Sequence, residues 1–72
     1  MTYAELKERY PTNALGSGWY DLSDDELEAD RRVAAAFRAA GAGKPEARGG
    51  RRIEGWIAAE LRARAHRYGA VA

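Results

Sequence analysis

Residues 23–40 read SDDELEADRRVAAAFRAA, and this stretch decides the fold. Ser23 stands three residues before Glu26, which is the spacing of a capping box: hydroxyl and carboxylate reciprocally satisfy free backbone N–H groups at a helix start. Acidic residues crowd the first turns and arginines follow, in the order that complements the helix dipole. Gly41 is a typical stop. The pattern therefore predicts a helix from Asp24 to Ala40.

This helix is predicted to be amphipathic, with a stripe of small residues on its buried side. On a helical wheel the charged residues Glu28, Arg31, Arg32 and Arg38 lie together on the other side. The side expected to face the core holds Ala29, Val33, Ala36, Phe37 and Ala40, with Leu27 at its margin.

Residues 51–68, RRIEGWIAAELRARAHRY, predict a second long helix that stops at Gly69. Glu60 and Arg64 are spaced to pair within it. Its main apolar stripe consists of Ile53, Ile57, Leu61 and Tyr68, and a second stripe of Gly55, Ala59 and Ala63 lies beside Trp56. A helix that is apolar on two sides either sits centrally in its own fold or turns one side toward another chain.

A capping box at Thr2 and Glu5 predicts a short helix over Tyr3–Arg9, which Pro11 ends. Residues 11–22 form an apolar connector whose Leu15, Trp19, Tyr20 and Leu22 are expected to fold back over the core, and residues 41–50 are expected to be a flexible loop. The predicted fold is one all-α domain over residues 1–72. It is a long antiparallel helical hairpin, capped by the short N-terminal helix and the aromatic connector.

Composition narrows the class of protein. The 72 residues allow one thin core, and the lack of cysteine excludes disulfides and thiolate zinc sites and fits a reducing cytoplasm. No apolar run is long enough to span a membrane, and residues 1–10 do not resemble a signal peptide. The excess of alanine, and of arginine over lysine, is typical of a GC-rich genome. These features suggest a small cytoplasmic regulatory protein, such as those that mobile elements carry.

The sequence lacks the parts of an active site, so we expect a non-enzyme without a cofactor. His66 is the only histidine and has no cysteine to join it as a metal ligand. The Gly43–Lys44 pair is not a phosphate-binding loop, because Arg38 stands where that motif needs glycine and Pro45 where it needs serine or threonine.

Two binding hypotheses remain. The first is an interaction module that binds a protein partner or forms a homo-oligomer, through Trp19, Tyr20, Gly55, Trp56, Ala59 and Ala63. The alternative is nucleic-acid binding through Arg48, Arg51, Arg52, Arg62, Arg64 and Arg67. Residues 1–40 hold five basic and eight acidic residues, and residues 41–72 hold seven and three. Against the alternative stand a net charge of only +1 and a predicted loop too long for a helix-turn-helix.

Overall fold

The computed structural model describes residues 1–11, 18–41 and 43–69. It contains, in chain order, α1 (Tyr3–Arg9), the 3-10 helix η1 (Gly18–Asp21), α2 (Asp24–Ala40) and α3 (Pro45–Gly69). The described part of the chain has no strand, so the all-α prediction is confirmed. The helices α1 and α2 have the predicted bounds, and both capping boxes form as predicted.

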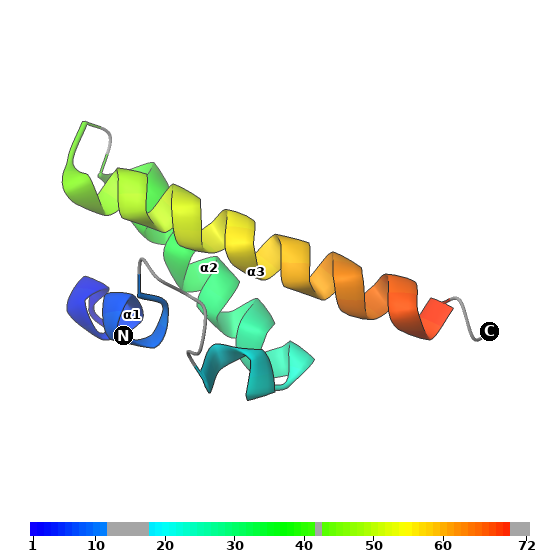
Figure 1. Ribbon diagram of the computed structural model, residues 1–72. Coiled ribbons are helices and arrows are strands. Elements are labelled where there is room, and N and C mark those ends of the chain that lie inside the picture. Colours follow the sequence, from blue (N-terminus) through cyan, green and yellow to red (C-terminus); the bar gives the residue numbers. More distant parts are fainter. Residues whose placement is uncertain (12–17, 42, 70–72) are drawn as a thin grey trace.

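The two long helices make the predicted hairpin: after residues 41–44 the chain turns back, and α3 crosses α2 (Figure 1). Both α1 and η1 lie on the same side of α3, and the C-terminal end of α3 extends past them (Figure 1). Because α3 has 25 residues and α2 has 17, α3 is longer by about 12 Å at a rise of about 1.5 Å per residue. The molecule is accordingly elongated, measuring 42 × 23 × 18 Å.

The prediction of a loop over residues 41–50 was wrong, because α3 begins at Pro45 rather than at Arg51. Proline suits the first position of a helix, where its missing N–H leaves no hydrogen bond unmade. Gly43 lies in the turn before α3, with a φ of 82°, whereas Gly49 and Gly50 lie within α3 and serve close packing. A Cβ on Gly50 would lie 2.6 Å from the carbonyl oxygen of Ala34, on α2. The helix backbones approach so closely here that only glycine fits.

The predicted buried side of α2 was right for Leu27, Val33 and Phe37, which pack in or against the core, and wrong for its alanines. Its buried residues are Leu27, Asp30 and Ala34, and Phe37 is half-buried beside them. The alanines at 29, 36 and 40 are exposed. Alanine buries little apolar surface and so hardly favours one side of a helix over the other. The orientation of α2 is fixed instead by Leu27 and by the hydrogen bonds of Asp30.

The core joins all four elements. Its buried apolar residues are Leu6, Tyr10, Trp19, Leu27, Ala34, Ile53 and Ile57. Leu22, Val33, Phe37, Trp56 and Leu61 pack against this cluster and are partly buried. Trp19 and Leu22 thus fold back over the core as predicted for the connector. The expected contributions of Leu15 and of the Tyr68 side chain lie outside what the structure describes, as does the tail 70–72.

Candidate nucleic-acid interface

The solvent-facing side of α3 carries four exposed arginines with small residues between them. We call this surface the arginine face; it consists of Arg48, Arg51, Arg52, Gly55, Ala59, Arg62 and Ala63, all exposed. A Cβ built on Gly55 meets nothing within 4 Å. The second stripe of α3, predicted from the sequence, therefore points to solvent rather than into the hairpin.

The acidic residues of α3 turn away from the arginine face. Glu54 accepts a hydrogen bond from Arg38 of α2, with 2.7 Å between Nε and Oε1. Glu60 accepts one from Nε of Arg64 at 2.9 Å, which confirms the predicted pair. Glu46, which is half-buried, lies at the end of α2, against Gly41. Within the described length of α3, no carboxylate therefore forms an ion pair with the arginine face.

The remaining arginines of the described chain are engaged in ion pairs, whereas those of the arginine face are not. Carboxylates lie within 4.0 Å of Arg9, Arg31, Arg32, Arg38, Arg64 and Arg67. Among the residues in view, no such pair involves Arg48, Arg51, Arg52 or Arg62. The guanidinium of Arg52 lies 5.5 Å from the ring centre of Trp56. The fold thus gathers four free positive charges on one surface of a nearly neutral chain.

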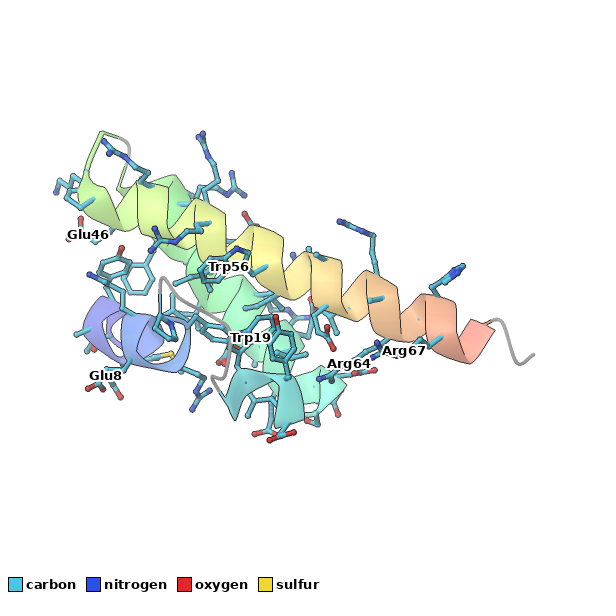
Figure 2. The ribbon with its side chains drawn as sticks, viewed as in Figure 1. Glu8, Trp19, Glu46, Trp56, Arg64 and Arg67 are labelled. Carbon is cyan, nitrogen blue, oxygen red and sulfur yellow. The ribbon has the colours of Figure 1, made fainter. Side chains whose placement is uncertain are left out.

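Arg64, predicted to bind nucleic acid, is instead a structural residue with a side chain only 10% exposed. It donates hydrogen bonds to the backbone carbonyls of Tyr20 and Leu22, both at 2.7 Å, and to Asp24 at 2.8 Å. The hydrogen bonds with Asp24 and Glu60 raise its pKa. Figure 2 shows this side chain reaching from α3 toward η1 and the start of α2. Arg64 therefore links the later part of α3 to η1 and to the start of α2.

Arg67, the other predicted nucleic-acid contact near the end of α3, is 62% exposed. Its Nη2 lies 3.6 Å from Glu60, on the same side as Arg64 (Figure 2). Arg67 is therefore not part of the arginine face.

The residues predicted to bind a protein do not form one surface. Trp19 is only 4% exposed and packs in the core against Tyr10, with ring centres 5.5 Å apart. Tyr20 is 46% exposed and stacks on Trp19. Trp56 is half-buried, and Figure 2 shows it on the side of α3 that faces α1 and η1. The stripe of Gly55, Ala59 and Ala63 is exposed on the arginine face, whereas Trp19 is buried in the core.

A partly buried polar cluster joins the end of α1 to α2 and was not predicted from the sequence. Asp30 Oδ2 accepts hydrogen bonds from the Tyr10 hydroxyl and from Arg9 Nη1, both at 2.7 Å. Burial, followed by the bond to Asp30, raises the pKa of Tyr10. Asp30 is thus paired with two donors from the end of α1, so the cluster holds α1 against α2. In the sequence, only the position of Asp30 near the apolar side of the predicted helix pointed to such a cluster.

Within residues 1–11, 18–41 and 43–69, no three side chains of the metal-binding types gather at one place. In the same described segments, no helix combines the length and the apolar character that crossing a bilayer requires. Comparison with protein families, with curated proteins and with solved structures finds no match to this chain.

Proposed function

We propose that this chain is a small, non-catalytic nucleic-acid-binding protein that lays the arginine face of α3 against phosphate groups. The observation that carries the proposal is the separation of charge on α3. Its acids turn toward α2 and toward Arg64, while Arg48, Arg51, Arg52 and Arg62 stay unpaired and exposed. The described part of the chain supplies no carboxylate partner for these four arginines, and the phosphates of a polyanion would supply four.

The dimensions of the arginine face suit a duplex. From Arg48 to Arg62 the helix rises about 21 Å. A helix is about 10–12 Å across with its side chains, and the major groove of B-DNA is about 12 Å wide. Gly55, Ala59 and Ala63 keep the middle of the face thin, so the helix can approach closely while the arginines reach the flanking phosphates.

The arginine face suits binding to the phosphate backbone, and the only bases that its side chains can recognise are guanines, which arginine reads in the major groove. Asparagine and glutamine, which recognise adenine, are no part of it: the chain has no glutamine, and its one asparagine is Asn13. Phosphate contacts position a protein without carrying sequence information. We therefore expect micromolar, strongly salt-dependent affinity, with any preference among sequences limited to guanine.

Two points bear on the competing hypothesis of a protein partner. If two copies met through the small-residue stripe, Arg51, Arg52 and Arg62 of both would be brought together, and like charges at an interface are unfavourable. A different protein partner would need an acidic surface. The loop-length objection to nucleic-acid binding was wrong, because only residues 41–44 connect α2 and α3. The protein-partner hypothesis nevertheless stays a prediction, and the test below separates the two.

The test is fluorescence anisotropy with a blunt duplex about two helical turns long and bearing 5′-hydroxyl ends. With four phosphates neutralised, the logarithm of the binding constant should fall with the logarithm of salt concentration at a slope of about −3.6. Affinity should then fall roughly 150-fold between about 50 and about 200 mM salt.

The decisive variant is Arg51→Gln with Arg62→Gln, which should make the slope shallower by about 1.8. The matched control is Arg32→Gln with Arg67→Gln, which removes the same charge at exposed positions off the arginine face. The control should keep most of the wild-type slope. If both double variants reduced the slope equally, binding would depend on the total charge of the protein and not on the arginine face. Absence of binding at about 50 mM salt, with an acidic protein captured instead, would support the protein-partner hypothesis.

A further inference from the structure

A hollow between α1 and the first turns of α3 is lined by three cationic side chains. Its volume is ≈ 420 Å³, within the range of small-molecule sites. The cations are Lys7 from α1 and Arg48 and Arg52 from α3. Tyr3, Gly43, Pro45 and Gly49 complete the lining as the structure describes it, and none of these is acidic.

The walls of the hollow are set by packing that gives the cations aromatic neighbours and no carboxylate among the described ion pairs. Lys7 Nζ lies 5.6 Å from the ring centre of Tyr3, and the Arg52 guanidinium lies 5.5 Å from that of Trp56. The Tyr3 hydroxyl donates to the carbonyl oxygen of Pro45 at 3.3 Å, so it is already occupied. The Tyr3 ring contacts Phe37 edge to face, with centres 5.5 Å apart. A side chain on Gly49 would collide with the Tyr3 hydroxyl, so glycine lets α1 close against α3 here. These contacts fix α1 beside α3 and thereby bring Lys7 to the two arginines.

No acidic residue lines the hollow, although Glu8 lines an adjoining one with Lys7. Glu8, the next residue after Lys7, lies on the side of α1 away from α3 (Figure 2). Glu46 packs at the end of α2, against Gly41, and does not line the hollow. Among the described ion pairs, none uses Lys7, Arg48 or Arg52. Arg48 and Arg52 stand one turn apart and so point to the same side of α3.

We propose that this hollow is a binding site for a phosphate monoester, held by Lys7, Arg48 and Arg52. A monoester carries a charge of about −1.5 to −2 near neutral pH and three acceptor oxygens, which suits a hollow lined by three cations. A phosphodiester within a strand carries a single negative charge and is bonded to a nucleoside on each side. A monoester is bonded to one nucleoside only, so just one substituent has to extend out of the hollow. The monoester belongs either to a mononucleotide or to the 5′ end of a nucleic acid. Because Arg48 and Arg52 also belong to the arginine face, the second source rests on the proposed function.

Two probe pairs differ only in the monoester. The first pair is AMP and adenosine, and the second is one duplex with 5′-phosphate or 5′-hydroxyl ends. Binding is measured by calorimetry and by the shift of amide signals in the full chain. We expect the phosphate-bearing member to bind at least about ten-fold more tightly, the worth of a charge-assisted contact. A gain in the AMP pair identifies the mononucleotide as a ligand, and a gain in the duplex pair identifies the nucleic-acid end.

Lys7→Gln should abolish the gain, and Lys7→Arg should retain it. The control is Lys44→Gln, because Lys44 lines a neighbouring surface with Arg48 and Arg51 but not the hollow. Circular dichroism establishes that each variant is folded. If neither pair discriminates, or if Lys7→Gln discriminates as wild type does, the monoester site is overturned. Salt-dependent binding of the 5′-hydroxyl duplex would then still uphold the arginine face. Loss of that binding, with AMP still preferred over adenosine, would uphold the hollow alone.

Discussion

Replacing Gly50 by alanine should destabilise the hairpin although alanine is the better helix former. The added Cβ would lie 2.6 Å from the carbonyl oxygen of Ala34 and 2.9 Å from the amide nitrogen of Arg38. Both atoms belong to the backbone of α2, so no side-chain rotation relieves the contact. Real Cβ atoms do not approach this closely, and α2 and α3 must therefore move apart.

The magnitude follows from two opposed terms. Overpacking of this kind costs about 1–3 kcal/mol, and a Gly→Ala change within a helix returns up to about 1 kcal/mol. Because the obstructing atoms cannot rotate away, we expect Gly50→Ala to lose about 1–2 kcal/mol of unfolding free energy. Gly55 supplies the matched control, since its Cβ would meet nothing within 4 Å. Gly55→Ala should gain up to about 1 kcal/mol.

Thermal unfolding followed by circular dichroism measures both variants. For a domain of this size, 1 kcal/mol shifts the Tm by about 4–8 °C, so the two alanine variants should differ by roughly 10 °C or more. A Gly50→Ala protein that melts at or above the wild-type temperature would refute the close approach of the helices at this position. A loss of stability in Gly55→Ala would refute the outward placement of that side of α3.

Three further predictions concern the polar contacts. Arg64→Met should cost roughly 1–3 kcal/mol of unfolding free energy, because the carbonyls that Arg64 serves lose their donor; Arg62→Met, on the exposed side, should cost almost nothing in the same urea titration. Because the pKa of Tyr10 is raised above its ordinary value of 10.0, the folded state keeps a proton that the unfolded chain loses. Unfolding free energy should therefore fall by up to about 1.4 kcal/mol per pH unit above about pH 10. Tyr10→Phe should lack this fall, and an unchanged slope would contradict the assignment. Ser23→Ala should lower the stability by about 1 kcal/mol through loss of the α2 cap, and an unaltered Tm would count against that cap.

The sequence predicted the helices that carry explicit end signals. Ser23 and Thr2, each followed three residues later by glutamate, marked the starts of α2 and α1, and both capping boxes form. The start of α3 has no such box. Gly49 and Gly50 are local signs of a loop, yet the structure uses them for contact with α1 and α2. A role that depends on a distant partner cannot be inferred from local spacing.

The candidate site was only partly predictable for a related reason. The sequence identified six candidate arginines between residues 48 and 67 but did not show which of them are exposed and which form ion pairs within the fold. Arg64 is separated from Arg62 by the orientation of α3, which depends on Ile53 and Ile57 being buried and on partners 40 to 44 residues away. Lys7, which adjoins Arg48 and Arg52 in the hollow, lies in another helix altogether. Such groupings appear only once the helices are packed.

Mapping the bound surface tests the arginine face most directly. A 5′-hydroxyl duplex is titrated into isotopically labelled protein at about 50 mM salt, and the backbone amide signals are followed residue by residue. The shifts should concentrate on α3 between Arg48 and Ala63, at the positions facing solvent, and the signals of α2 should stay in place. Shifts gathered around Tyr20 and η1 with α3 unmoved, or no shift at all at micromolar to millimolar duplex, would contradict the account.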